Sequence, residues 1–215
     1  MKDQDHIVNA LRSLSRSIRV SSDRAWSREP ALRVIDCVLS LNRNYDRFVV
    51  PRLDSFEEDR PCVRSVSDLN IEIARHASPD EFVRLALNYK DKDRANMLAN
   101  VARWLLTISG NGEDAAQLAN LETWARTAPY RGYQILGVKG FALAGFQYLR
   151  MLFGANTTKP DIRICDWVKS VVGHPVSPSQ ALQLLEHAAV EAGVCLRDAD
   201  TTIWEMSARG SQGCA

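Results

Sequence analysis

The stretch from Ile135 to Gly154 reads ILGVKGFALAGFQYLRMLFG and indicates two helices joined by a short turn. The turn falls at Gly137–Gly140, because glycine permits positive φ angles and the close approach of another backbone. From about Phe141, apolar residues recur at helical spacing, and Gly154 follows in a position that commonly ends a helix. The stretch therefore predicts a helical hairpin.

The rest of the 215-residue chain has the same helical periodicity. Ile7, Leu11 and Leu14 recur on one face of an N-terminal segment, and Ser-Pro steps at Ser78 and Ser177 are typical helix starts. No stretch of convincing length alternates as a strand does. The sequence thus predicts an all-α fold of about ten helices with short connections.

Composition narrows the class of protein. The chain has 27 Lys and Arg against 26 Asp and Glu, a net charge of +1, so it has no general excess of basic charge. Contact with nucleic acid would have to come from a local patch or from backbone groups. The apolar runs are far shorter than the ~18 residues of a membrane span, and the polar N-terminus predicts no secretory signal.

Cysteine and histidine are too scattered to suggest a metal centre. The five cysteines include no C-x-x-C pair, which argues against a zinc knuckle or an iron–sulfur loop. The four histidines are isolated from one another. We therefore expect no metal ligands and a reducing, cytoplasmic location.

The hairpin is the first candidate for binding. Amide groups at the start of its second helix would point toward an anion, and the helix dipole favours negative charge there. A DNA phosphate fits this geometry without much side-chain charge. The candidate DNA-binding residues are Gly137, Val138, Lys139 and Gly140. An ordinary turn between two helices is the alternative interpretation.

Three further stretches accompany the hairpin. Asp161, in Lys159-Pro160-Asp161, comes seven residues after Gly154; residues 38–45 read VLSLNRNY; and residues 89–98 read YKDKDRANML. Together with the hairpin and the segment 199–205, they resemble the helix-hairpin-helix DNA glycosylases, the endonuclease III-like superfamily. The resemblance covers about residues 30 to 209.

The resemblance implies two helical lobes around a cleft, containing the helix-hairpin-helix motif. We expect residues 1–28 to form an N-terminal helix packed on a core of residues 29–209, with a frayed tail at 210–215. The implied function is hydrolysis of the N-glycosidic bond of a damaged or modified base in double-stranded DNA. We expect a monomer without membrane contact, located in the cytoplasm with the nucleoid.

The resemblance also assigns site residues. Asp161 would be the catalytic carboxylate, stabilising an oxocarbenium-like sugar or activating water, although Pro-Asp is also a common helix cap. Asn42, with Arg43, would fill the gap left by the extruded nucleotide; a plain polar turn is the alternative. Aromatic residues that would wall the base pocket, or else lie in the core, are Tyr45, Trp104, Tyr148 and Trp167.

Two departures from the family pattern limit the expected chemistry. Members with lyase activity carry a Lys where this chain has Leu143 or Ala144, and Lys139 comes too early to replace it. We therefore expect a monofunctional glycosylase. The hairpin also lacks the usual Gly-x-Gly and allows a register starting at Gly137 or at Gly140, which weakens the expected binding of phosphate and of a monovalent cation.

No other cofactor and no iron–sulfur cluster are expected. Two alternatives to the enzyme stay open. One is a non-catalytic helix-hairpin-helix DNA-binding protein. The other is an unrelated helical interaction domain, in which Asp161 is only a cap and the hairpin only a turn.

Overall fold

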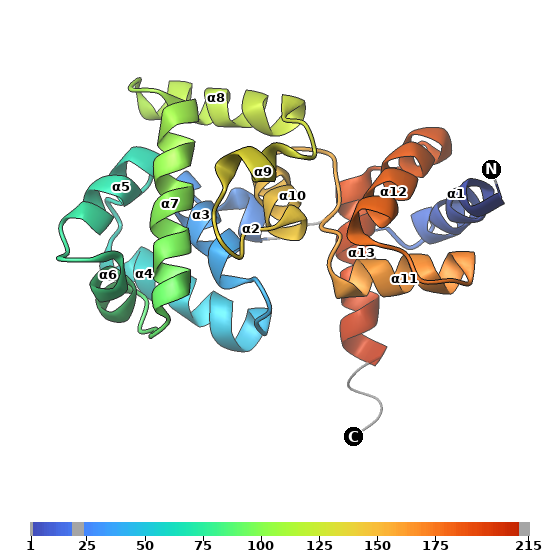
Figure 1. Ribbon diagram of the computed structural model, residues 1–215, viewed down its shortest axis with the longest axis horizontal. Coiled ribbons are helices and arrows are strands. Elements are labelled where there is room, and N and C mark those ends of the chain that lie inside the picture. The colour runs from blue at the N-terminus through green and yellow to red at the C-terminus, as the bar shows by residue number, and fades with distance from the viewer. Residues whose placement is uncertain (1, 19–23, 211–215) are drawn as a thin grey trace. The chain divides into compact units, whose positions relative to one another are not determined.

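The computed structural model describes residues 2–18 and 24–210, and every regular element in these ranges is a helix (Figure 1). The predicted all-α class is confirmed. The described residues form thirteen α-helices and one π-helix, more than the ten expected, because short elements such as α2 (Arg24–Ser27) and α9 (Gly132–Leu136) escape a periodicity argument. The tail predicted at 210–215 lies outside the described residues except for Gly210, the last residue of α13.

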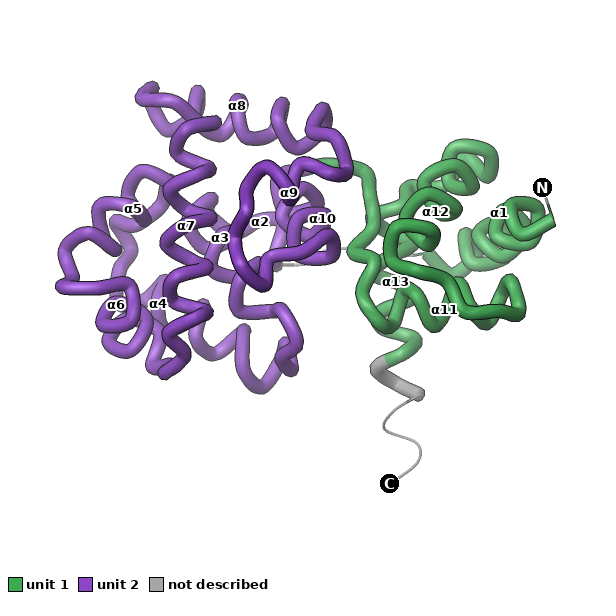
Figure 2. Tube along the Cα trace, in the orientation of Figure 1, with its two compact units in different colours: residues 1–23, 155–215 green, residues 24–154 purple. Residues whose placement is uncertain are grey.

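The chain divides into two compact units (Figure 2). Unit 2 is the middle of the chain, Arg24–Gly154, whereas unit 1 combines Met1–Asp23 with Ala155–Ala215. The segment predicted at residues 1–28 is divided between the units. Its first part forms α1 and shares unit 1 with the C-terminal helices, whereas Arg24–Ser27 form α2 in unit 2, and residues 1 and 19–23 lie outside the described ranges.

Unit 2 is arranged around α7 (Lys92–Ser109), its longest helix, which contacts α3, α5, α6 and α8 (Figure 1). Buried Leu32, Ile35, Leu53 and Phe56 contribute to the core of this unit. Its other elements are α3 (Pro30–Leu39), η1 (Tyr45–Val49), α4 (Val50–Asp59), α5 (Val66–Ala74), α6 (Pro79–Ala86), α8 (Asp114–Thr127) and α10 (Leu143–Leu152).

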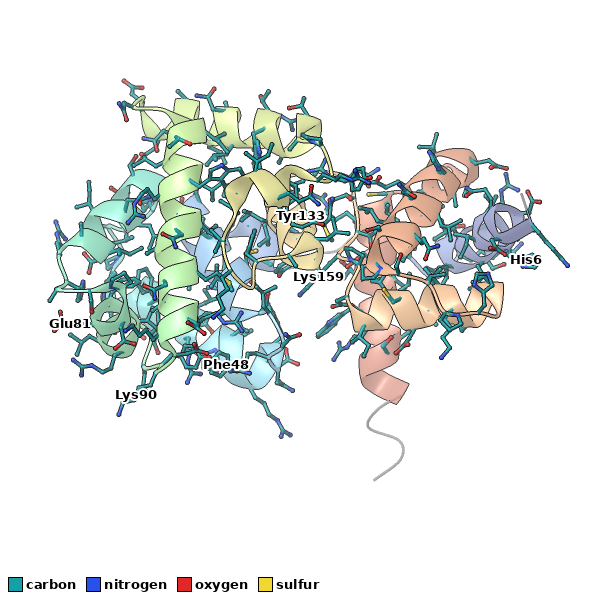
Figure 3. The ribbon with its side chains drawn as sticks, in the orientation of Figure 1. His6, Phe48, Glu81, Lys90, Tyr133 and Lys159 are labelled. Atoms are coloured by element: carbon teal, nitrogen blue, oxygen red, sulfur yellow. The ribbon has the colours of Figure 1, made fainter. Side chains whose placement is uncertain are left out.

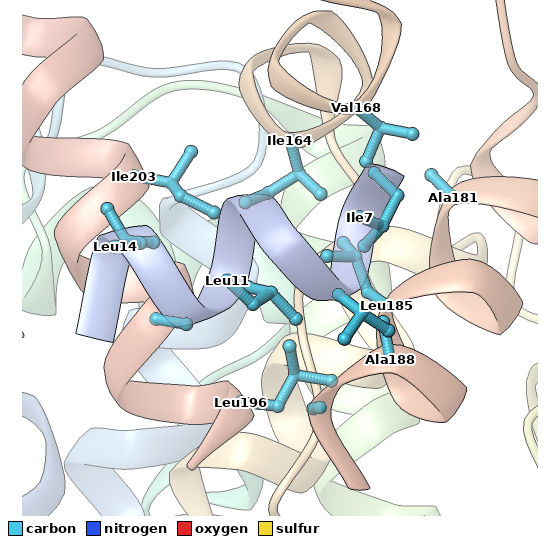
Figure 4. Close-up of a cluster of buried hydrophobic side chains, with 13 residues drawn as sticks. Ile7, Leu11, Leu14, Ile164, Val168, Ala181, Leu185, Ala188, Leu196 and Ile203 are labelled. Atoms are coloured by element: carbon cyan, nitrogen blue, oxygen red, sulfur yellow. The ribbon is translucent and has the colours of Figure 1, made fainter. Parts of the chain in front are cut away.

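Unit 1 packs α1 (Lys2–Ser15) against α11 (Ile162–Val172), α12 (Pro178–Ala192) and α13 (Leu196–Gly210). The predicted apolar face of the N-terminal segment is the buried one: Ile7 and Leu11 are fully buried, in contact with a cluster that includes Ile164, Leu185 and Ile203 (Figure 4). Burial of this stripe accounts for the helical spacing in the sequence.

Capping side chains mark the residues at which two of the helices begin. Ser78 accepts a hydrogen bond from the Glu81 amide at the start of α6, and Ser177 caps α12 in the same way through the Gln180 amide. Both Ser-Pro predictions are therefore confirmed. Among the described residues, no helix is both long enough and apolar enough to cross a membrane.

Candidate functional site

The hairpin joins α9 to α10 through residues 137–142. Gly137 has φ 62° and Gly140 has φ 80°, so both glycines adopt the left-handed conformation that other residues avoid. The Phe141 amide donates to the Val138 carbonyl and closes the turn. The sequence allowed the hairpin to start at either glycine. In the structure both belong to the same turn, and both have the positive φ that favours glycine.

Contact with α7 fixes this turn in place. Phe141 is buried, and a Cβ added to Gly140 would come within 2.9 Å of the Met97 side chain. The second helix begins two residues later, at Leu143, and its N-cap residue Ala142 has no side-chain acceptor. The first amides of α10 are therefore left without a side-chain cap, as a site for an external anion would require.

The other residues of the hairpin are exposed or apolar. The Lys139 side chain is 91% exposed, and its Nζ lies 3.8 Å from the Asp93 carboxylate, whose side chain is 81% exposed; such a solvated pair contributes little to stability. Leu143 is buried and Ala144 is half-buried, and neither side chain carries an amine. The binding of a monovalent cation at this turn stays a prediction, because a carbonyl oxygen such as that of Val138, which accepts one hydrogen bond inside the turn, has a second lone pair.

Asn42 lies at an exposed turn between α3 and η1. Its φ of 56° is left-handed, a conformation that Asn tolerates better than most residues. Arg94 of α7 donates to the carbonyls of Val38 and Leu41, at 2.9 and 3.0 Å, and these two hydrogen bonds hold the end of α3 and the start of the turn. The Asn44 side chain then caps η1 by accepting from the Arg47 amide.

Arg43 lies in a cluster of aromatic and charged side chains rather than alone. Its guanidinium donates to the Tyr89 hydroxyl at 3.0 Å and lies 5.7 Å from the centre of the Phe48 ring, a residue labelled in Figure 3. Tyr89 in turn donates to Asp91, the N-cap of α7. The hydrogen bond from the Arg94 amide lowers the pKa of Asp91, which keeps this carboxylate charged beside Arg43.

Two of the predicted pocket residues meet at a carboxylate that sequence reasoning missed. Asp36 of α3 is fully buried and accepts from the Tyr45 hydroxyl at 2.7 Å and the Tyr148 hydroxyl at 3.0 Å. Trp26 packs edge-on against Tyr148, with ring centres 6.5 Å apart. The signal in the sequence was an acid within the mostly apolar run 31–39, since a buried carboxylate needs such donors.

The other two aromatic candidates lie elsewhere. Trp104 belongs to a cluster with Trp124 and Phe146, at ring distances of 5.2 and 6.3 Å, in the body of unit 2. Trp167 packs against the apolar cluster of unit 1. Within unit 2 the structure thus brings together Tyr45 and Tyr148, whereas Trp104 belongs to a different aromatic cluster.

Asp161 is the N-cap of α11. Its Oδ1 accepts from the amides of Arg163 and Ile164, at 3.0 and 3.3 Å, while its Oδ2 accepts no hydrogen bond from the described residues. The residue is partly exposed. One oxygen therefore stabilises the helix, and the other stays available to chemistry at a helix N-terminus, where the dipole favours the anion.

The chain belongs to a known family of domains. The model of the family described as "Domain of unknown function (DUF8548)" matches residues 5–208, nearly the whole chain and both units. Comparison found no match among curated proteins and none among solved structures.

Proposed function

We propose that this protein is a DNA glycosylase that removes a damaged or modified base by hydrolysis and lacks lyase activity. The observation that carries the proposal is the divided role of Asp161, whose Oδ1 caps α11 while Oδ2 is left without a partner among the described residues. A residue serving only as a cap needs no carboxylate, because Ser and Asn cap about as well as Asp.

The chemistry needs one anion beside the sugar. As the glycosidic bond breaks, positive charge develops at C1′, and a carboxylate held at that point stabilises it or takes a proton from the attacking water. Water adds to C1′, the base leaves with a proton, and an abasic site remains. No step requires a cofactor, and Leu143 and Ala144 supply no amine for an imine.

Unit 2 has the separate role of holding double-stranded DNA. The uncapped start of α10 would bind a phosphate through backbone amides, which suits a chain with a net charge of +1. Asn42, on its rigid exposed turn, would occupy the space of the extruded nucleotide. Tyr45 and Tyr148, oriented by Asp36, are the favoured aromatic residues for contact with the base.

Base-release profiling tests the proposal. Duplexes carrying alkylated, oxidised, deaminated or phage-type modified bases are incubated with the wild-type protein, with Asp161→Asn and with Asp166→Asn. Asp166 is an exposed carboxylate on the same helix and provides the matched control. We expect Asp161→Asn to lose release by about a hundredfold or more while the helix stays capped, and Asp166→Asn to retain it.

Two outcomes favour the other functions. Salt-dependent binding of duplex DNA without release of any base would indicate the non-catalytic DNA-binding protein. The absence of both binding and release would leave an unrelated helical interaction domain, with Asp161 as a cap only.

A further inference from the structure

The loop that leads to Asp161 is anchored residue by residue within unit 1. We call Asn156–Lys159 the anchoring loop. The Asn156 side chain accepts from the amides of Leu196 and Arg197, at 2.8 and 3.2 Å, and so caps α13 from outside that helix. Thr157 donates to the Glu186 carboxylate of α12 at 2.9 Å. The loop is therefore fixed to two helices before it reaches Lys159, which Figure 3 labels.

The last anchor is a buried acid, Asp200 of α13. Its Oδ1 accepts from the Thr158 hydroxyl at 2.5 Å and from the Lys159 amide at 2.8 Å. Thr158 is fully buried and Asp200 is 8% exposed. The Lys159 carbonyl then accepts from the Asp161 amide at 2.7 Å. A continuous path of hydrogen bonds thus runs from Asp200 through one residue to Asp161.

We infer that Asp200 is a positioning residue, which sets the place of the Asp161 carboxylate through the backbone of Lys159. The inference rests on the proposed function and deepens it. A buried carboxylate is a costly way to fill space, because an apolar side chain would pack there without loss of hydration. What Asp200 supplies is one acceptor for two donors of the loop that carries Asp161.

The proposed reaction depends on the exact position of the Asp161 carboxylate. A displacement of about 1 Å at a catalytic group costs up to about a hundredfold in rate. Loss of Asp200 would release both Thr158 and Lys159, whereas α11 would keep its cap because Asp161 itself provides it. The expected effect is therefore on the reaction rate and not on DNA affinity.

The ionisation of Asp200 gives the positioning role a second measurable consequence, a dependence of the reaction rate on pH. The groups that act on it are Asp161 and Lys159, and burial, the largest influence, raises its pKa to about 7. Near neutrality Asp200 becomes an anion, and its bonds from Thr158 and Lys159 become charge-assisted and stronger. We expect the rate of base release to rise through this range in the wild type, and Asp200→Asn to lack the rise.

The test uses the full chain and a duplex that the wild type processes. Single-turnover base release is measured for Asp200→Ala, Asp200→Asn and the control Asp198→Ala, two residues earlier on α13. Affinity is measured with the same duplex carrying a tetrahydrofuran abasic analogue. We expect Asp200→Ala to lose about tenfold or more in rate with affinity within about twofold. Asp200→Asn keeps an acceptor and should recover most of the rate at pH 6, while Asp198→Ala resembles the wild type.

Hydrogen exchange of the Lys159 and Asp161 amides, measured without DNA, separates this inference from the proposed function. Faster exchange at both amides in Asp200→Ala, together with the loss of rate, supports the inference. Faster exchange with an unchanged rate, while Asp161→Asn is inactive, overturns the positioning role and leaves the glycosylase intact. Should no duplex lose a base, the proposed function fails and the catalytic positioning fails with it.

Unchanged exchange in Asp200→Ala would overturn the anchoring itself, whatever the activity. If Asp200→Ala does not fold, Thr158→Val takes its place, since it removes one of the two donors and adds no charge. Thr158→Ser restores the hydroxyl and should restore both the protection of Lys159 and the rate. Failure of Ser to restore them would contradict the inference.

Discussion

Replacing Asp200 by Asn should change how stability depends on pH in a calculable way. An unfolded Asp has a pKa near 3.8, and burial raises that of Asp200 to about 7 in the folded chain. The folded state therefore binds the proton more tightly than the unfolded state. Between these two values, stability falls as pH rises, and above about pH 7 the loss is complete.

The size of the effect follows from the shift. One pKa unit corresponds to about 1.4 kcal/mol, so between pH 5 and pH 8 the wild type should lose on the order of 3 kcal/mol through this residue. Asp200 is 8% exposed, so solvent screens it little. The Asn variant cannot titrate and lacks this loss. The difference in unfolding free energy, Asn variant minus wild type, should therefore rise by that amount over this range.

Urea unfolding at half-unit pH steps measures the difference. Other titrating groups cancel in it, including His174, whose pKa is raised by its bonds to the Pro175 carbonyl and Asp3 and whose contribution is lost as pH rises. A difference that stays constant with pH, or that falls as pH rises, would refute the assignment of a buried, proton-binding Asp200.

Four further substitutions or assays follow from the candidate site. Asn42→Gly should keep stability and lose base release, whereas Asn42→Ala should also cost about 1 kcal/mol for its left-handed φ, as urea unfolding would measure. Gly140→Ala should destabilise slightly more than Gly193→Ala and weaken DNA binding by fluorescence anisotropy, because both glycines have a positive φ but only a Cβ at Gly140 would displace the end of the Met97 side chain. Tyr148→Phe should cost about 1–2 kcal/mol in urea unfolding, since Asp36 loses a buried donor, and an unchanged midpoint would contradict that role. Borohydride should trap no covalent adduct with DNA, and an adduct that Lys139→Ala abolishes would reverse the prediction of a monofunctional enzyme.

The helices and their starts were predictable because their causes are local. An apolar stripe such as Ile7 and Leu11, or a cap such as Ser78, acts within a few residues of itself. The hairpin was predictable for the same reason, since Gly137 and Gly140 are needed by the backbone of their own turn. The division into units was less accessible, because it depends on α1 meeting helices some 150 residues later.

The polar partners of the candidate residues could not be predicted, because they come from distant parts of the chain. Asp36 meets Tyr148 across 112 residues, and Thr158 meets Asp200 across 42. An acid within an apolar helix indicates that donors must exist but does not identify them. For the same reason, Trp104 and Tyr148 were equal candidates for the base pocket in the sequence. Only their packing in the structure distinguishes them, since Trp104 contacts Trp124 whereas Tyr148 binds Asp36.

Asp36 and Asp200 have a comparable role, each within its own unit. Each is a buried acid on a helix. Asp36 accepts from the two tyrosines proposed to contact the base, and Asp200 accepts from the loop that leads to Asp161. Burial of each acid costs hydration that an apolar residue would not lose, and the hydrogen bonds it accepts offset part of that cost. Stability lost at two such positions is explained if both hold side chains in fixed places: the tyrosines in unit 2, and Asp161 in unit 1. On this argument each carboxylate acts through the residues that it holds in its own unit, and substitution of either should lower the proposed activity more than it lowers DNA affinity.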